Sequence, residues 1–448
     1  MSELIERARD FATRAHQRID QRRKYSEQPY DVHLEAVARL VASTTDDEEM
    51  IAAAWLHDVA EDTPATLEDV QREFGASVAL LVQDLTDVSR PSDGNRAARK
   101  EVDRRHLALA SPRAKTIKLA DLIDNCEDIT RNDPRFARVF LQEMDALLGV
   151  LGEGDAGLLR RARDLHQTCQ TKLREPPPAA TAQPSVGLAA VLPHLASPHI
   201  VRMFREKFAA GDMFDPLLSF DADRPVSAIA RIMASRLPGV AGIRVDGTVQ
   251  GYVHLSDASD VGDGPAGLRM QPISTNQVVD ADAPLIDVVD VLTRHDHCFV
   301  STFGAVIGVI ERDAVNKPVV RMWLFGAITL YEMGLVPLIE RIFPDDAWHG
   351  ALAPGRLDKA MQLQSERERR GRPCPLIECL QFSDKAQIML EHPPTMERLG
   401  FPSKKAGKRL IRELESLRNH LVHSQDIVSH DWPQIIRIAH RLTELGVY

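Results

Sequence analysis

The residues best suited to chemistry lie in one short stretch, where His57-Asp58 is followed by Glu61-Asp62. An imidazole nitrogen and a carboxylate oxygen can together bind Mn²⁺, Zn²⁺ or Fe²⁺. The pattern around them predicts a helix, on which Glu61 and Asp62 lie one turn after the pair and on nearly the same face. Carboxylates in that place can act on a metal-bound water of lowered pKa as it attacks a phosphate. The stretch therefore indicates a metal-dependent phosphohydrolase.

A purely structural interpretation of the same stretch is also open. A lone His-Asp pair is common on protein surfaces, and Glu61-Asp62-Thr63 before Pro64 has the composition of a helix end. On the dipeptide alone, this interpretation is favoured. The choice depends on the surrounding residues, which include His33 and Asp121 as further candidate ligands.

Composition limits the class of protein. The chain has 448 residues, a net charge of −10 and five scattered cysteines. Its length suggests about three domains, and its charge disfavours a general nucleic-acid-binding protein. The cysteines fit a reducing cytoplasm. The N-terminus lacks a secretory signal, and the apolar run Met322 to Tyr331 is about half as long as a spanning helix. We expect a soluble, cytoplasmic protein without a membrane partner.

Periodicity divides the chain into segments. Residues 1–174 have apolar positions at three- and four-residue spacing, which predicts an almost wholly helical domain. Residues 175–194 are rich in proline and alanine and have the composition of a linker. Residues 350–448 return to helical periodicity, with an amphipathic helix expected over Lys404 to Val422. The predicted fold is therefore multidomain, with all-α domains at both ends.

The middle segment, residues 195–345, contains a weak internal repeat. Each copy predicts a helix, a short apolar strand, a tight turn and a second strand, with the turns at Asp246-Gly247 and Phe303-Gly304. This order resembles a pair of CBS modules, which are α/β units. That resemblance implies an adenine nucleotide as a ligand. A structural or dimerising pair is at least as well supported, because the ribose-binding pattern is poor: Asp257 could hold a ribose, but Glu311, in Glu311-Arg-Asp313, would repel a phosphate.

A series of motifs in the first 170 residues resembles the HD-domain alarmone hydrolases, which include the hydrolase half of Rel/Spo proteins and small stand-alone enzymes. The motifs occur in the family's order: Asp10 to His16, Gln21 to Lys24, Pro29 to His33, Leu56 to Thr63, Phe74-Gly75 and Ile117 to Asn125. The resemblance implies an all-helical fold and Mn²⁺-dependent removal of the 3′-pyrophosphate of (p)ppGpp, which leaves GDP or GTP. Nothing after Pro178 resembles the family's synthetase, so we expect hydrolysis without synthesis.

The resemblance also implies roles by position. The metal ligands would be His33, His57, Asp58 and Asp121. Catalytic work on the water would fall to Glu61 and Asp62. The substrate-binding residues would be Arg23, Lys24, Tyr30, Asn125 and Asp128, with Tyr30 beside the base or supporting His33. Alone, Arg23 and Lys24 would be a solvated basic run and Asn125 a helix-terminal residue.

Two departures from the family leave the substrate open. The spacing between His16 and the basic pair is longer than in close relatives, and Ser89 to Arg105 is hard to align, although its arginines and Lys100 could contact phosphates. Relatives act on guanosine or adenosine alarmones or on NADPH. ppGpp, pppGpp, ppApp and NADPH are therefore all candidate substrates.

The C-terminal segment contains Arg418-Asn-x-x-x-His423, a pattern that resembles HEPN domains, many of which are metal-independent ribonucleases. In that chemistry Arg418 would stabilise phosphate charge and His423 would exchange protons with the RNA 2′-OH. This gives an alternative function, a ribonuclease or effector with the HD domain as its alarmone sensor. A helical interaction bundle is the simpler interpretation. Since CBS and HEPN modules both tend to dimerise, we expect a homodimer.

Overall fold

The structure, a computed structural model, describes residues 2–23, 28–174, 208–233, 239–254, 264–393, 396, 404–427, 432 and 435–436. The chain forms two compact units. One comprises Met1–Thr181 and Phe214–Arg312, and the other comprises Ala182–Met213 and Asp313–Tyr448. The predicted linker over 175–194 lies outside the described residues.

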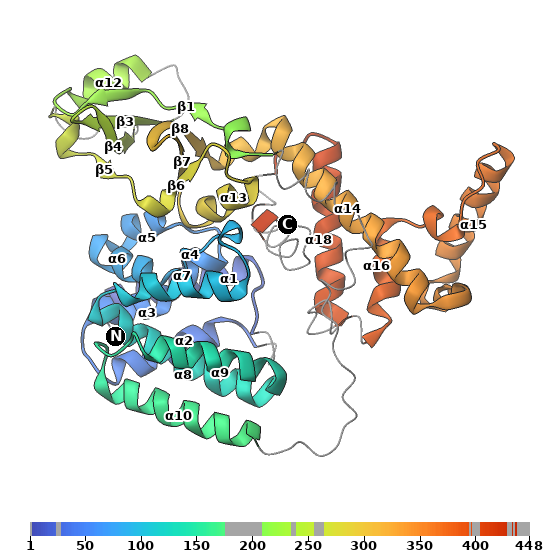
Figure 1. The fold of residues 1–448 in the computed structure, drawn as a ribbon, viewed down its shortest axis with the longest axis horizontal. Coiled ribbons are helices and arrows are strands. Elements are labelled where there is room, and N and C mark those ends of the chain that lie inside the picture. The colour runs from blue at the N-terminus through green and yellow to red at the C-terminus, as the bar shows by residue number, and fades with distance from the viewer. Residues whose placement is uncertain are drawn as a thin grey trace. The chain divides into compact units, whose positions relative to one another are not determined.

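The N-terminal domain is helical over residues 3–174, as the periodicity predicts (Figure 1). Its helices are α1 (Glu3–Arg18), α2 (Asp31–Ala42), α3 (Glu48–Leu56), α4 (Val59–Asp62), α5 (Leu67–Phe74), α6 (Ala76–Leu85), the 3₁₀ turn η1 (Pro91–Asp93), α7 (Arg96–Ala108), α8 (Pro112–Asn132), α9 (Pro134–Leu148) and α10 (Ala156–Arg174). Side-chain caps begin several of them: Asp47 accepts from two backbone N–H groups of α3, and Thr66 forms a capping box with Asp69 at α5.

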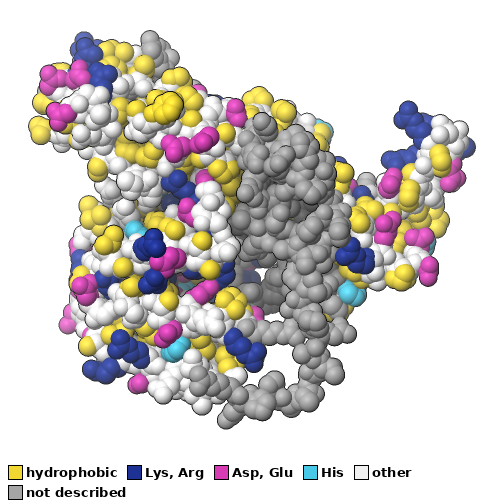
Figure 2. All heavy atoms as spheres, in the orientation of Figure 1, with side chains coloured by type: hydrophobic (Ala, Val, Ile, Leu, Met, Phe, Trp, Pro, Cys, Tyr) yellow, Lys and Arg dark blue, Asp and Glu magenta, His cyan; other side chains and the backbone are white. Residues whose placement is uncertain are grey.

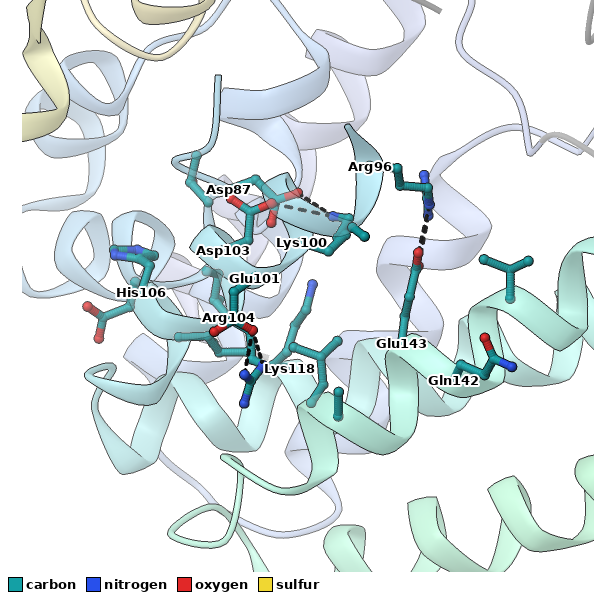
Figure 3. Close-up of a pocket in the computed structure, with 18 residues that line it drawn as sticks. Asp87, Arg96, Lys100, Glu101, Asp103, Arg104, His106, Lys118, Gln142 and Glu143 are labelled. Carbon is teal, nitrogen blue, oxygen red and sulfur yellow. Dashed lines mark hydrogen bonds and ion pairs between the residues drawn. The ribbon is translucent and has the colours of Figure 1, made fainter. Parts of the chain in front are cut away.

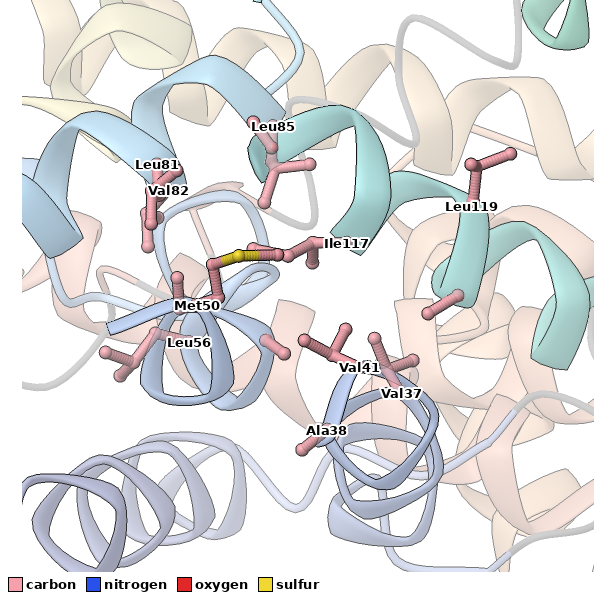
Figure 4. Packing of buried hydrophobic residues seen from close by; sticks show 14 of the residues in the cluster. Val37, Ala38, Val41, Met50, Leu56, Leu81, Val82, Leu85, Ile117 and Leu119 are labelled. Atoms are coloured by element: carbon pink, nitrogen blue, oxygen red, sulfur yellow. The ribbon is translucent and has the colours of Figure 1, made fainter. Parts of the chain in front are cut away.

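The core of this domain is centred on α3, which packs against α1, α2 and α6. Every residue of α3 from Met50 to Leu56 is buried, because neighbouring helices cover it on all sides. Side chains of Val41, Leu85 and Ile117, from three other helices, face the same core (Figure 4). This packing fixes where the end of α3 points.

The prediction of one continuous helix through His57-Asp58 is wrong. Helix α3 ends at Leu56 and α4 begins at Val59, so the pair forms a turn between two helices. Asp58 has φ −97° and ψ −1°, in the sparsely populated bridge region where many active-site residues lie. The turn lets two adjacent side chains face one point, which a regular helix would separate by about 100°.

Two four-stranded sheets form the middle of the chain, with orders β2-β3-β4-β5 and β1-β8-β7-β6. The elements are β1 (Asp215–Pro216), β2 (Ser219–Asp221), α12 (Val226–Met233), β3 (Val240–Val245), β4 (Thr248–His254), β5 (Gln271–Pro272), β6 (Val278–Asp280), α13 (Leu285–Arg294), β7 (His297–Thr302) and β8 (Ala305–Glu311). Short 3₁₀ turns η6 (Ala266–Leu268) and η7 (Thr275–Gln277) join them. We call residues 214–312 the sheet module.

The predicted repeat is confirmed in the sheet module. Each copy has a short strand parallel to the first strand of a hairpin, with a helix between them and a register shift at the same point, Ile243/Arg244 and Val300/Ser301. Both predicted turns have two residues of positive φ, Asp246 (51°) with Gly247 (80°) and Phe303 (51°) with Gly304 (78°), as a type I′ hairpin requires. The copies also exchange strands, since β1 pairs with β8 and β5 with β4.

The second unit is built from helices. Its elements are η4 (Ala210–Asp212), α14 (Pro318–Ile342), η9 (Pro344–Ala351), α15 (Pro354–Arg369), η10 (Leu376–Cys379), α16 (Phe382–Leu390) and α18 (Lys404–Val422), and η8 (Arg312–Asn316) precedes α14. Helices α14, α16 and α18 pack against one another, with Trp323 and Phe382 fully buried. The helix predicted over Lys404 to Val422 is confirmed.

The apolar run Met322 to Tyr331 lies inside a longer helix, since α14 has 25 residues. Its most apolar window has a mean hydropathy of 1.6, with 53% of it buried inside the protein. By length and composition this helix could cross a membrane, and a buried core helix passes the same test. Elsewhere, acidic and basic side chains intermingle on the visible surface of the described residues (Figure 2).

Candidate metal centre

Four side chains converge at the turn between α3 and α4. His33 comes from α2, His57 and Asp58 from the turn, and Asp121 from α8. The His57 Nε2 atom lies 3.1 Å from Asp58 Oδ2 and 3.8 Å from Asp121 Oδ1. The His33 Nε2 atom lies 3.4 Å from each of the same two oxygens. The predicted metal ligands are therefore brought together from three parts of the chain.

The donor atoms of this cluster suit a metal ion. Both Nε2 atoms are buried without a hydrogen-bond partner among the described residues, which is costly unless a ligand satisfies them. Each ring is oriented through its other nitrogen, His57 Nδ1 by Ala54 O at 2.8 Å and His33 Nδ1 by Asp124 Oδ2 at 2.7 Å. Outer partners of this kind are typical of metal-binding histidines. Two imidazoles and two carboxylates fit Mn²⁺, Zn²⁺ or Fe²⁺.

Electrostatics favours a cation at the centre. Burial lowers the pKa of His57, but the carboxylates of Asp58 and Asp121 outweigh it and raise this pKa to about 10. The pKa of His33 is likewise held well above its usual value, because Asp121, Asp124 and Asp58 outweigh burial. The same negative field that would hold protons on the rings attracts a divalent ion, which must displace those protons.

Glu61 and Asp62 lie beside the centre on α4. Glu61 Oε1 accepts a hydrogen bond from the backbone N–H of Asp87 at 2.6 Å. Burial, and then the nearby carboxylates of Asp87 and Asp58, raise the pKa of Glu61 to about 8. Asp62 Oδ2 accepts from Gln21 Nε2 at 2.8 Å. The pKa of Glu61 therefore lies near neutral pH, the range that suits a group exchanging protons with water during catalysis.

Two predicted substrate-binding residues contact predicted metal ligands. The hydroxyl of Tyr30 donates to Asp58 Oδ2 at 2.7 Å, and the centre of its ring lies 5.4 Å from that of His33, the residue it was predicted to support. Asn125 Nδ2 donates to Asp121 Oδ1 at 2.6 Å. Both side chains therefore hold carboxylates of the cluster by hydrogen bonds, and their binding of substrate stays a prediction.

Only Arg23 of the predicted basic pair, Arg23 and Lys24, lies among the described residues. The Arg23 guanidinium pairs with Asp124 at 2.7 Å and with Asp128 at 3.2 Å, and its side chain is 9% exposed. Arg23 and Asp128, which were both predicted to bind substrate, therefore form an ion pair with each other. Lys24 lies outside the described residues.

Sequence reasoning missed three residues of the site. Asp124 links His33 to Arg23, Lys118 Nζ lies 2.9 Å from Asp121 Oδ2, and Asp87 holds Glu61 through its backbone. A signal was present for two of them, since Lys118 and Asp124 lie one turn on either side of Asp121 along α8. Asp87 had no such signal, because it reaches the site from a separate segment.

A cavity of about 400 Å³ lies beside Lys118. Besides Lys118, cationic side chains from α7 line it, namely Arg96, Lys100 and Arg104 (Figure 3). Each of these cations pairs with a carboxylate: Arg96 with Glu143 at 2.7 Å, Lys100 with Asp87 at 2.7 Å, Arg104 with Glu101, and Lys118 with Asp121 at 2.9 Å. We call this space the α7 pocket. Its lining on α7 belongs to the segment Ser89 to Arg105, which is hard to align with the family, and its other lining residues come from α6, α8, α9 and the segment after α6.

The predicted C-terminal pair is less tightly organised. The Arg418 guanidinium lies 3.9 Å from Glu332 of α14 and is 40% exposed, while His423 is exposed just after α18. Glu332 also binds Lys385 at 3.1 Å. Arg418 and His423 therefore lack the buried, convergent geometry of the metal centre.

Comparison with known proteins agrees with the metal centre. Residues 8–149 match the family model described as "HD domain". Human guanosine-3′,5′-bis(diphosphate) 3′-pyrophosphohydrolase MESH1 is 39% identical over 136 residues, which are 30% of this chain and 73% of that protein. The chain belongs to the MESH1 family.

Other MESH1-family proteins give the same match. The Drosophila melanogaster MESH1 protein is 41% identical over 119 residues, 26% of this chain and 65% of that protein. A solved structure entitled "A metazoan ortholog of SpoT hydrolyzes ppGpp and plays a role in starvation responses" has 31% identity and a TM-score of 0.34, and covers 38% of this chain and 96% of that one. The part of this chain that matches the HD-domain family model, residues 8–149, is about the N-terminal third of its length.

Proposed function

We propose that this protein hydrolyses the 3′-pyrophosphate of guanosine-3′,5′-bis(diphosphate), or of a closely related alarmone. One observation carries the proposal: the Nε2 atoms of His33 and His57, which lack a hydrogen-bond partner among the described residues, meet the carboxylates of Asp58 and Asp121 at the start of α4, the helix that carries Glu61. The named activity of the MESH1 relatives supports the choice of substrate.

His33, His57, Asp58 and Asp121 would hold the metal ion, for which we propose Mn²⁺. A divalent ion there supplies a water of lowered pKa and offsets phosphate charge. Tyr30 and Asn125 keep the two carboxylate ligands in place through their hydrogen bonds. Asp124 fixes the ring of His33, so the centre is oriented before substrate binds.

The reaction adds water across one P–O bond. The water oxygen bonds to the phosphorus that is attached to the ribose 3′ oxygen. The bond from this phosphorus to the 3′ oxygen then breaks. Glu61 accepts the proton of the water, and the released 3′ oxygen gains a proton, which gives GDP and pyrophosphate. Asp62, held by Gln21, orients the water from the other side.

We propose that the phosphate groups of such a substrate enter the α7 pocket, where they would take the place of the carboxylates that now pair with its cations. Lys118 contacts both Asp121 and the pocket, so phosphates can extend from the centre toward Lys100 and Arg96. Cations in fixed positions offset the charge of diphosphates, and arginine can do so with two parallel hydrogen bonds. A polyanionic nucleotide is therefore the substrate class that we propose.

The test is to incubate purified full-length protein with Mn²⁺ and ppGpp, and to measure pyrophosphate and GDP. We expect both products in equal amounts, and none with the Glu61→Gln/Asp62→Asn variant. A wild type that releases no pyrophosphate would refute the proposal. Parallel assays with pppGpp, ppApp and NADPH identify the preferred substrate.

We also propose that the sheet module is a CBS-like pair that binds an adenine nucleotide or dimerises the chain. Its support is the matched repeat with exchanged β1 and β5. Equilibrium dialysis with labelled AMP and ATP tests nucleotide binding, and ultracentrifugation tests the homodimer. The cytoplasmic location stays a prediction.

The HEPN-like ribonuclease also stays a prediction. It is tested by metal-independent RNA cleavage that Arg418→Ala or His423→Ala abolishes. RNA left intact by the wild type would discard it.

A further inference from the structure

Helix α4, which carries Glu61 and Asp62, packs against helix α13 of the sheet module within the same compact unit. All residues of α13 from Leu285 to Thr293 are buried, whereas α12 of the first repeat buries only Val226, Ile229 and Met233. The two copies of the repeat therefore differ in their surroundings. The second copy is the one that contacts the catalytic helix.

Arg312, at the end of the second copy, joins the two parts. Its guanidinium donates to the carbonyls of Leu292 at 3.0 Å and Thr293 at 3.3 Å, at the end of α13. It also donates to the carbonyl of Pro64 at 2.7 Å, two residues after Asp62. One planar group thus ties α13 to the segment that leaves α4.

The segment on the other side of Glu61 is held in the same way. The backbone N–H of Asp87 donates to Glu61. Two residues later, the carbonyl of Ser89 accepts from Arg294 of α13 at 3.4 Å. The Arg90 guanidinium donates to the carbonyls of Asn276 and Val278 at 2.9 and 2.8 Å. Ser92 also binds the buried carboxylate of Asp287 on α13 through its hydroxyl.

A third contact fixes the start of α5. The carboxylate of Glu68 accepts from His295 Nδ1 at 2.9 Å, from Gln277 at 3.1 Å and from the backbone N–H of Asp296 at 3.2 Å. Thr66 donates to Asp296 at 3.0 Å. Both chain segments that flank the catalytic carboxylate are therefore anchored on the sheet module.

We infer that the sheet module positions Glu61 for catalysis, with Arg312 as a positioning residue that acts through Pro64 and α4. The inference rests on the proposed hydrolysis at this site. A shift of α13 would move α4 relative to α2 and α8, which supply His33 and Asp121. Displacement of a catalytic group by about 1 Å can cost about 10²-fold in rate, so the state of the sheet module would control turnover.

The test compares Arg312→Ala, Arg312→Lys and Arg244→Ala in the full-length protein with Mn²⁺ and ppGpp. Arg244 is the matched control, because it lies in the first repeat and pairs with Asp221. We expect Arg312→Ala to lower kcat about tenfold with KM and Mn²⁺ affinity unchanged, and also to lower Tm, because three carbonyls lose their donor. Arg312→Lys should recover part of kcat, and Arg244→Ala should match the wild type. An Arg312→Ala kcat within twofold of the wild type would overturn the inference.

A double-mutant cycle with Glu61→Gln separates positioning from a general effect. If Arg312 acts through Glu61, Arg312→Ala should cost clearly less in the Glu61→Gln background, and fully additive effects would contradict the inference. If Arg312→Ala does not fold, Arg90→Ala decides: a lowered kcat supports the inference and an unchanged kcat overturns it. An inactive wild type would instead refute the proposed hydrolysis, and the inference with it.

Discussion

Glu61 and Glu68 lie on either side of Pro64, and both carboxyl groups are largely withdrawn from water, yet their pKa values shift in opposite directions. Burial, Asp87 and Asp58 raise the pKa of Glu61 to about 8. For Glu68, burial also raises the pKa, but His295 and backbone N–H groups outweigh it and lower the value. Burial is common to both, so the difference comes from the partners.

The difference separates a reactive region from a structural one. Around Glu61, carboxylates gather and two imidazole nitrogens lack partners among the described residues, which leaves the region incomplete without a cation and a substrate. Around Glu68, donors from the sheet module satisfy the carboxylate. Since His295 Nε2, beside Glu68, also lacks a partner among the described residues, it is the convergence of two imidazoles and several carboxylates on one point that distinguishes the Glu61 side.

The largest effect should come from removing a metal ligand on the Glu61 side. Asp121→Asn withdraws one negative charge from the centre, so we expect loss of Mn²⁺ binding by calorimetry and a fall of hydrolysis to the background rate. The matched control is Asp128→Asn, which removes a carboxylate on the same helix. Asp128 pairs with Arg23 and is outside the proposed ligand set, so this variant should retain Mn²⁺ binding. Tight Mn²⁺ binding by Asp121→Asn would contradict the assigned ligand set.

Glu61→Gln should lower kcat by about 10²- to 10⁴-fold, because proton transfer by a positioned side chain contributes about that much. Since Glu61 is not among the proposed metal ligands, the Mn²⁺ affinity of the Glu61→Gln variant should stay near that of the wild type. Steady-state kinetics and Mn²⁺ titration measure the two effects. A variant with full kcat would remove Glu61 from the mechanism.

Glu68→Ala should act on stability. It leaves His295 buried without its carboxylate, and breaking such a pair costs about 3 kcal/mol of unfolding free energy. Urea denaturation of the metal-free protein measures this value. A loss below 1 kcal/mol would show that Glu68 does not hold the sheet module in place.

The pH dependence of stability should distinguish the two glutamates without metal. The folded-state pKa of Glu61, about 8, lies above its usual value of 4.5. The contribution of Glu61 to the free energy of unfolding is therefore complete below pH 4.5 and is lost as the pH rises toward 8. We expect the stability of Glu61→Gln relative to the wild type to increase between pH 5 and pH 8. A constant difference over this window would show that the pKa of Glu61 is not raised.

The smallest effect should come from Glu73→Ala, the matched control for Glu68 on the same helix. Glu73 lies 3.9 Å from Arg7, and its side chain is 48% exposed. Exposed ion pairs contribute little, so we expect a change below about 0.5 kcal/mol. A loss equal to that of Glu68→Ala would mean that any carboxylate on α5 matters, and the comparison would fail.

Sequence patterns predicted much of the architecture. Helical periodicity identified the N-terminal domain, and the repeated turns at Asp246-Gly247 and Phe303-Gly304 identified the two hairpins. The break at His57-Asp58 was missed, because the apolar pattern runs through it without a glycine or proline. The apolar run Met322 to Tyr331 did not show how far α14 extends, since Glu332 and Pro337 lie inside a helix that packs against its neighbours.

The sequence by itself determined the chemistry available to this protein, through the types and spacing of His33, His57, Asp58 and Asp121. Tertiary structure alone decided how that chemistry is arranged. The proposed ligands come from α2, from the turn after α3 and from α8, and they meet only because α2, α3 and α8 pack on one core. The packing of α13 on α4 and the opposite pKa shifts of Glu61 and Glu68 likewise depend on contacts between distant residues. Local sequence cannot encode them, because pKa values and positions are set by the groups that folding brings near.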